Sequence, residues 1–222
     1  MTPLPWLALL VWGTVAGLDL ASVLQGLLNR PLVAGTVAGI MIGDAGAGLR
    51  IGAALELFAL DVLPVGASRY PDYGAATVAA VALGAWQPWD TALGPAVLLG
   101  LLIAQLGGWS IVGQRRVTAW ALHRAAQRLD RGDPGVARRL HLLGLVTDMV
   151  RSAGLALLGL GAVALLTREP LFDLSTGHAL TVVAVAGGFV ALIAGALRRA
   201  GTVRRIAWLA CGIAVGAIGL VL

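Results

Sequence analysis

Residues 29–44 read N-R-P-L-V-A-G-T-V-A-G-I-M-I-G-D, a short apolar run that begins at a helix break. Two further short runs follow, separated by Gly, Pro and charged residues. The three runs are Leu32–Ile42, Ile51–Val65 and Ala75–Trp86. A helix that crosses a bilayer needs roughly 20 apolar residues, and shorter runs are more often re-entrant or interfacial. We therefore predict re-entrant or broken helical hairpins between Arg30 and Trp89, with short spans in a thin membrane as the alternative.

The composition of the chain places these runs in a membrane. Of the 222 residues, 59% are hydrophobic and 12% are charged, and the mean hydropathy is +0.89. A soluble domain carries about 25% charged residues, so this chain lacks the polar groups to cover a globular surface. The composition excludes a soluble enzyme and a disordered protein, and it predicts an integral membrane protein.

Longer apolar runs outside this region predict full membrane spans. In chain order they are Leu4–Leu28, Thr91–Val112, Leu142–Leu166, Ala179–Leu197 and Ile206–Leu222, of which the last is just long enough to cross. Because no basic residue precedes Arg30, the first run lacks the charged region of a cleavable signal, and we expect it to remain in the mature protein. The predicted fold class is an all-α, polytopic transmembrane helical bundle.

The charges are distributed unevenly along the chain. All 16 basic residues are Arg, and 13 of them lie in residues 114–222. Clustered Arg residues are typical of loops kept on the cytoplasmic side, so the turn Ala196–Arg205 should lie inside and the loop Thr167–His178 outside. A nucleic-acid partner is excluded, because the chain has no polar domain to carry a basic patch. The predicted location is the cell inner (cytoplasmic) membrane, crossed several times.

Residues 114–141 differ in kind from the apolar runs. Small and apolar residues recur there at helical spacing, and Arg residues occupy the opposite face. The pattern predicts an amphipathic helix at the cytoplasmic surface, acting as a docking surface or mobile arm, or only as a connector. Near its end Asp133 can cap a new helix that starts with Pro134.

The chain is therefore expected to have three parts. Residues 1–113 form an N-terminal membrane core that holds the half-length hairpins and the candidate binding site. Residues 114–141 form the connector, and residues 142–222 form a C-terminal helical hairpin with a final span.

Glu56 is the strongest candidate for a functional residue. It lies between Leu55 and Leu57 in an apolar run. A carboxylate at the centre of a membrane helix costs about 2.5–3.5 kcal/mol, so such residues usually face a cavity or a partner. Glu56 is expected to accept hydrogen bonds from a ligand or act as a protonatable gate. The structural alternative is a buried ion pair with Arg50 or Arg69.

Other acidic residues have both structural and functional interpretations. Asp61 precedes the helix-breaking residues 62–66, and Asp72 can bind a ligand, cap the next segment or pair with Arg69. We expect Asp19 to hydrogen-bond to a neighbouring helix. Asp148 and Arg151 are three residues apart and should form a pair on one helix face.

Glycines and reactive side chains complete the pattern. Gly35, Gly39 and Gly43 recur every four residues, a spacing that lets two helices approach closely. The three His residues lack the spacing of metal ligands, and Cys211 is alone. No phosphate-binding loop is present. We expect no metal, no cofactor and no catalytic residue, and the sequence leaves open whether the chain is part of an enzyme.

The motifs taken together resemble a known family. Residues 29–44, then Gly48, then Ile51–Leu57 and finally Pro71-Asp72 follow the order and spacing of the IIC subunit of mannose/fructose/sorbose-type sugar phosphotransferase systems. A weaker similarity continues to Arg151 and a faint one to the C-terminus. The chain departs from the family pattern at residues 64–66, which read P-V-G where N-I-G is common.

The resemblance implies a membrane subunit that binds a sugar and carries it inward. Its implied partners are a IID membrane subunit, a cytoplasmic IIB protein that donates a phosphoryl group from His, and IIA, in an oligomer of IIC–IID pairs. By position Glu56, Asp72 and Asp61 are the expected sugar-binding residues. Two alternatives remain open, namely an ion- or proton-coupled secondary transporter and a non-transporting membrane scaffold.

Overall fold

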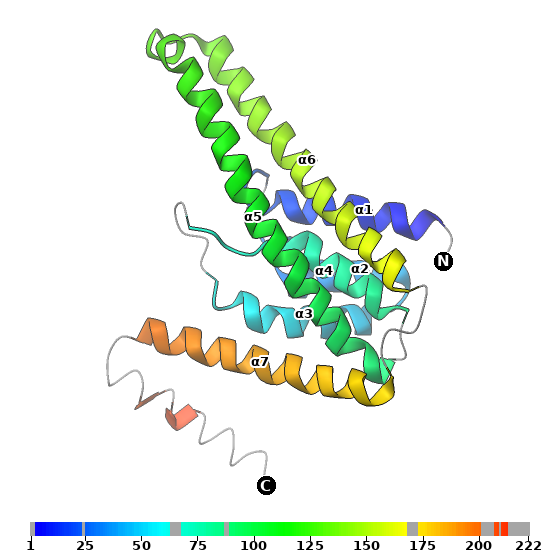
Figure 1. Cartoon of the computed structure of the whole chain (residues 1–222). Coiled ribbons are helices and arrows are strands. Elements are labelled where there is room, and N and C mark those ends of the chain that lie inside the picture. Colours follow the sequence, from blue (N-terminus) through cyan, green and yellow to red (C-terminus); the bar gives the residue numbers. More distant parts are fainter. Residues whose placement is uncertain are drawn as a thin grey trace.

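The computed structural model describes residues 3–23, 25–62, 68–86, 89–167, 173–200, 207–208 and 210–212. Within them every regular element is an α-helix, which confirms the predicted fold class. The helices are α1 (Pro3–Leu18), α2 (Pro31–Ile42), α3 (Ala45–Ala59), α4 (Tyr73–Gly84), α5 (Trp89–Asp130), α6 (Pro134–Leu166) and α7 (Leu174–Ala200). Helices α1 to α4 and α7 run roughly alongside one another, and the α5–α6 pair crosses them obliquely (Figure 1).

Helices α2 and α3 form a hairpin of two half-length helices. Pro31 opens α2, where its missing N–H is no loss. Gly43 ends α2 with a φ of 86°, a left-handed conformation that suits glycine. Asp44 then caps α3 by accepting a hydrogen bond from the Ala47 N–H at 2.8 Å. At about 1.5 Å per residue both helices are shorter than a bilayer core of about 30 Å, as predicted. Their depth in the membrane stays a prediction.

The glycines of α2 and α3 let the two backbones approach closely. A Cβ built on Gly35 would lie 2.6 Å from the carbonyl oxygen of Gly48, and one on Gly39 would lie 2.9 Å from the Cα of Gly48. Neither distance leaves room for a methyl group. The predicted packing role is therefore confirmed for Gly35 and Gly39, but not for Gly43, which has nothing within 4 Å of a built Cβ and ends α2 instead.

Helix α4 lies at the centre of the molecule, and all of its residues are buried. Val78 and Val81 are among its fully buried side chains, and they belong to one apolar core with Leu9 of α1, Leu55 of α3 and Val97 of α5. The residues that begin α4 are thereby fixed in the middle of the bundle.

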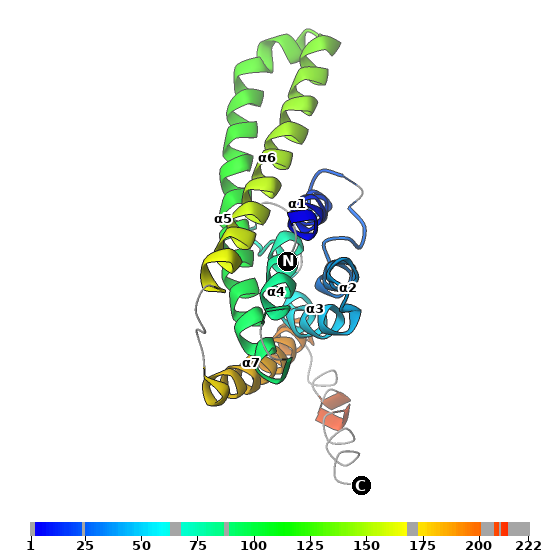
Figure 2. The same cartoon turned by 90° about the vertical axis from the view of Figure 1, so that its right-hand side faces the viewer.

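The amphipathic stretch predicted for residues 114–141 is helical and its helix ends just before Gly132, as predicted, but it continues the helix that precedes it. Its location at the cytoplasmic surface stays a prediction. Helix α5 continues without a break from Trp89 to Asp130, and α6 continues from Pro134 to Leu166. The physical reason is that residues 113–130 contain no proline or cap that would end a helix already formed. The two helices pack as an antiparallel hairpin whose tip projects beyond the other helices (Figure 2).

The turn at the tip of this hairpin follows the prediction. Gly132 has a φ of 73°, and Asp133 caps α6 by accepting hydrogen bonds from the N–H groups of Gly135 and Val136. Pro134 occupies the first turn of α6. A hydrogen bond of 2.9 Å from Arg128 holds the pKa of the Asp133 carboxyl below its usual range.

The prediction of a full span over Leu4–Leu28 is also wrong, because α1 ends at Leu18. The carboxylate of Asp19 accepts hydrogen bonds from backbone N–H groups later in the chain, so the described residues among 19–30 belong to a loop. Among the described residues, three helices are long and apolar enough to cross a membrane, namely α5, α6 and α7.

Several predictions fall outside the described residues. They concern the helix break at residues 64–66, part of the external loop Thr167–His178, part of the basic turn Ala196–Arg205 and most of the final span Ile206–Leu222.

Candidate functional site

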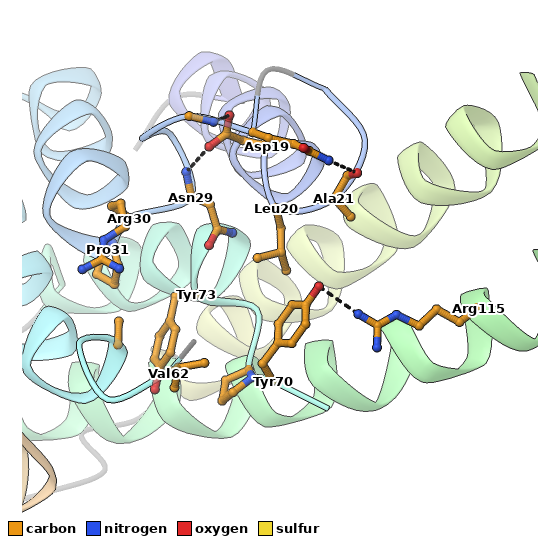
Figure 3. Close-up of a pocket in the computed structure, with 14 residues that line it drawn as sticks. Asp19, Leu20, Ala21, Asn29, Arg30, Pro31, Val62, Tyr70, Tyr73 and Arg115 are labelled. Carbon is orange, nitrogen blue, oxygen red and sulfur yellow. Dashed lines mark hydrogen bonds between the residues drawn. The ribbon is translucent and has the colours of Figure 1, made fainter. Parts of the chain in front are cut away.

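A cavity of about 560 Å³ lies between the loop that follows α1, the residues that precede α4, and α5 (Figure 3). Its lining combines aromatic, amide and charged side chains with apolar ones. The residues are Asp19, Leu20, Ala21, Gln25, Gly26, Asn29, Arg30, Pro31, Ala59, Val62, Tyr70, Pro71, Tyr73 and Arg115. We call this space the first cavity.

Asp19 organises the loop on one side of the first cavity. It is 3% exposed, and its two oxygens accept hydrogen bonds from the N–H of Gly26 at 2.9 Å and of Asn29 at 3.0 Å. Gln25 adopts a φ of 49°, which few residues other than glycine adopt. The expected bond from Asp19 to a neighbouring helix is thus replaced by bonds to its own loop.

Asn29 connects the first cavity to the buried Asp72. The Asn29 side-chain amide donates to Oδ1 of Asp72 at 3.2 Å and to the carbonyl of Ala16 at 3.3 Å. Asp72 is fully buried and also accepts from the N–H of Gly74, so the predicted cap of α4 is confirmed. Its charged partner is Arg151 at 2.7 Å. The alternative prediction, that Asp72 pairs with Arg69, is wrong.

Arg151 is the centre of a buried polar network. It pairs with Asp148 at 2.8 Å on the same helix, as predicted, and with Asp72 across the bundle. It also donates to the carbonyl of Gly17 at 3.3 Å and to the hydroxyl of Ser152 at 3.1 Å. Helix α6 is thereby connected to the ends of α1 and α4.

Glu56 pairs with Arg30, a residue that the sequence analysis did not connect with it. Its second oxygen accepts the backbone N–H of Leu32 at 3.1 Å, near the N-terminus of α2, where negative charge is favoured. The α2–α3 hairpin brings the start of α2 beside Glu56 on α3. Glu56 is absent from the lining of the first cavity, but its partner Arg30 belongs to it.

Asp61 occupies a different place in the fold. It pairs with Arg198 and therefore connects the end of α3 to α7. A Cβ on Gly195 of α7 would overlap the Asp61 carboxylate, so the two helices are close there. Asp61 does not belong to the lining of the first cavity.

Tyr70 and Arg115 form the edge of the first cavity on the α5 side. The Arg115 guanidinium donates to the Tyr70 hydroxyl at 2.9 Å and to the carbonyl of Ser68 at 2.8 Å. It also lies 5.1 Å from the centre of the Tyr70 ring, a cation–π distance. The sequence analysis missed both residues, because it placed Arg115 on a surface helix.

A signal for the tyrosines was present in the sequence. The chain has only two Tyr residues, they flank Pro71-Asp72, and both line the first cavity. Within the described residues, no three His, Cys, Asp or Glu side chains gather as metal ligands would.

The first cavity offers both hydrogen-bond donors and acceptors. Asp19 brings acceptor oxygens, Arg30 and Arg115 bring donors, and the amides of Gln25 and Asn29 can do either. Such a mixture, beside aromatic rings, suits a small ligand with many hydroxyl groups.

Comparison with known proteins gives relatives of one kind. A family described as "PTS system sorbose-specific iic component" matches residues 4–218. The fructose permease IIC component of Bacillus subtilis is 31% identical over 152 residues, which cover 68% of this chain and 55% of that protein. The mannose-specific EIIC component of Escherichia coli is 29% identical over 125 residues, or 56% and 46% of the two chains. The chain thus spans about half the length of the curated relatives it matches.

Two solved structures share the fold over the whole chain. One is described as "Structure of membrane protein" and matches with a TM-score of 0.69 at 23% identity, covering 100% of this chain and 94% of that one. The other contains the mannose transporter ManYZ with microcin E492. It matches with a TM-score of 0.60 at 25% identity, covering 100% of this chain and 93% of that one.

Proposed function

Because the chain belongs to the family of sorbose-type IIC components of the phosphotransferase system, we propose that it binds a sugar in the first cavity and carries it across the membrane. The observation that carries this proposal is the first cavity itself. Its volume lies within the roughly 300–1,000 Å³ of small-molecule sites, and its lining can hydrogen-bond a hydroxylated ligand from several sides.

In this proposal the predicted sugar-site carboxylates act on the sugar indirectly, through the side chains that they hold. Glu56 holds Arg30, and Asp72 holds Asn29, so each carboxylate positions a side chain that lines the first cavity. Asp61 connects α3 to α7 and would act on the site through the placement of α3. Direct contact of Glu56, Asp72 and Asp61 with a sugar stays a prediction.

The proposed partners are those of the family. We expect a IID membrane subunit beside this chain, and cytoplasmic IIB and IIA proteins that deliver a phosphoryl group to the sugar as it emerges. The complex would be an oligomer of IIC–IID pairs in the cell inner membrane. A fructose permease and a mannose transporter among the similar proteins support a hexose as the substrate class.

The test is phosphoenolpyruvate-dependent phosphorylation of sugars. Membranes from the host, with and without the gene, are supplied with host cytosol and a panel of labelled hexoses, hexosamines and hexitols. We expect one sugar to be phosphorylated only when the gene is present, and the Asn29→Leu variant to lower its apparent affinity about tenfold. Exposed Gln127 on α5 provides a matched control, because Gln127→Leu removes an amide outside the cavity.

Other outcomes would contradict the proposal. Uptake of an unphosphorylated sugar that collapses with the proton gradient would indicate a secondary transporter. If neither phosphorylation nor uptake depended on the gene, a scaffold would be the better description.

A further inference from the structure

A second cavity, of about 540 Å³, lies between α5, α6 and the loop that follows α1. It shares two lining residues, Ala21 and Arg115, with the first cavity. Its lining is Ala21, Ser22, Ile111, Gln114, Arg115, Thr118, Ala119, Leu122, Leu140, His141, Gly144 and Leu145. Its volume is also within the range of small-molecule sites.

The second cavity differs from the first in having no carboxylate in its described lining. The first cavity contains the carboxylate of Asp19, whereas no carboxylate occurs among the described residues that line the second. Its polar side chains include Arg115, Gln114, Thr118 and His141, each of which can donate a hydrogen bond. An anion would therefore meet donors and the guanidinium of Arg115 in the second cavity, without the carboxylate that accompanies Arg30 and Arg115 in the first.

One acidic residue, Asp148, contacts a residue of the second cavity without lining the cavity itself. The Ser22 hydroxyl donates a hydrogen bond to Asp148. This carboxylate is fully buried and forms an ion pair with Arg151. Two of the five N–H groups of Arg115 donate to Ser68 and Tyr70, which orient the guanidinium. Its planar fork matches phosphoryl oxygens well.

We infer that the second cavity binds a phosphoryl group carried by a small molecule. The residues that line the second cavity support a phosphoryl group as the ligand, whatever molecule bears it. That this molecule is a phosphorylated sugar rests on the proposed function. On that basis the sugar would occupy the first cavity before phosphorylation, and the phosphate ester would occupy the second cavity afterwards, with Arg115 between them. The headgroup phosphate of a lipid is the other source of the same chemistry.

The experiment uses the full chain in nanodiscs of phosphatidylcholine, with mannose 6-phosphate as the probe and titration calorimetry as the measurement. We expect mannose 6-phosphate to bind, and inorganic phosphate to compete with it. Gln114→Leu and, separately, the nearly isosteric Thr118→Val should each weaken binding about tenfold. Gln127→Leu, an exposed amide on the same helix, should leave binding unchanged.

A parallel sample with phosphatidylglycerol in the nanodisc identifies the source of the phosphoryl group. If this lipid weakens mannose 6-phosphate binding, the natural occupant is a headgroup; if it does not, the occupant is a soluble ester. Both results support a phosphoryl site. An absence of binding to the unaltered chain, or binding that neither Gln114→Leu nor Thr118→Val changes, would overturn it.

The two proposals can fail separately. Free mannose and free fructose are titrated into the same samples, and sugar phosphorylation is measured in membranes. If no sugar binds or is phosphorylated while mannose 6-phosphate binding depends on Gln114, the proposed function is wrong and the phosphoryl site stands. If sugars are phosphorylated but the ester does not bind, only the second cavity has been misassigned.

Discussion

Glu56 was expected to contact a ligand or act as a gate, and in the structure it forms an ion pair with Arg30. Its carboxylate in an apolar run predicts a partner or a cavity, and the structure supplies Arg30 as the partner. Arg30 in turn lines the first cavity. The carboxylate therefore acts on the cavity through the guanidinium, and the effect of removing either group should depend on the other.

A double-mutant cycle tests this dependence. Glu56→Gln and Arg30→Gln should each weaken sugar affinity about tenfold, since hydrogen bonds to charged groups contribute about 1.5–3 kcal/mol. If Glu56 acts only through Arg30, the double variant should be no weaker than Arg30→Gln alone. Additive losses would instead mean that Glu56 contacts the sugar itself. If the Glu56→Gln variant transports sugar with the rate and affinity of the unaltered protein, Glu56 has no role in the sugar site.

Arg151 should contribute strongly to the stability of the fold. It compensates two fully buried carboxylates, Asp72 and Asp148, and its own side chain is 5% exposed. We expect Arg151→Met to lower the free energy of unfolding by about 3–5 kcal/mol, because it leaves buried charges without a partner. Thermal unfolding in detergent measures the loss. Arg139→Met, an exposed Arg on the same helix, is the control and should shift the midpoint little.

At the scale of elements, the α2–α3 hairpin is held by backbone contact between glycines. A Cβ on Gly48 would lie 2.7 Å from the Cα of Gly39 and closer still to the carbonyl of Gly35. Backbone atoms cannot move aside as a flexible side chain can, so the two helices would have to separate.

The corresponding variant is Gly48→Ala. It should lower the free energy of unfolding by about 1–3 kcal/mol, the usual cost of overpacking. Gly154→Ala on α6 is the matched control, since a Cβ there meets nothing within 4 Å, and it should be neutral or slightly stabilising. Equal effects of the two substitutions in a thermal unfolding experiment would contradict the packing argument.

At the scale of the whole molecule, the α5–α6 hairpin is the most prominent feature. It projects beyond the other helices (Figures 1 and 2). The sequence places Arg residues on both sides of its turn, among them Arg128, Arg131 and Arg138. The Arg124 guanidinium lies 4.2 Å from the ring centre of Trp120, a pairing of groups that favour the membrane–water interface. Positive charge at the tip predicts that the tip lies on the cytoplasmic side.

Cysteine labelling can determine the orientation of the chain. In a Cys211→Ala background, Arg131→Cys places one thiol at the hairpin tip, and Asp173→Cys places one just before α7. A membrane-impermeant maleimide should label position 131 only in inside-out vesicles and position 173 only in right-side-out vesicles. Labelling of both positions from the same side would reject the predicted topology.

The sequence by itself determined what depends on local composition and short spacing. Low charge excluded a soluble fold, and short apolar runs predicted the half-length helices α2 and α4. The capping of α4 by Asp72 and of α6 by Asp133 followed from residues two or three positions away. Such features need no knowledge of distant partners, because the atoms involved are already close along the chain.

Only the tertiary structure decided which distant groups meet. Glu56 and Arg30 are 26 residues apart, Tyr70 and Arg115 are 45 apart, and Asp72 and Arg151 are 79 apart. For Glu56 and Asp72 the sequence offered Arg partners of equal charge, and nothing in their spacing pointed to Arg30 or Arg151. Packing selected among them, because burying α4 and crossing it with the α5–α6 hairpin brings only certain guanidinium groups within reach.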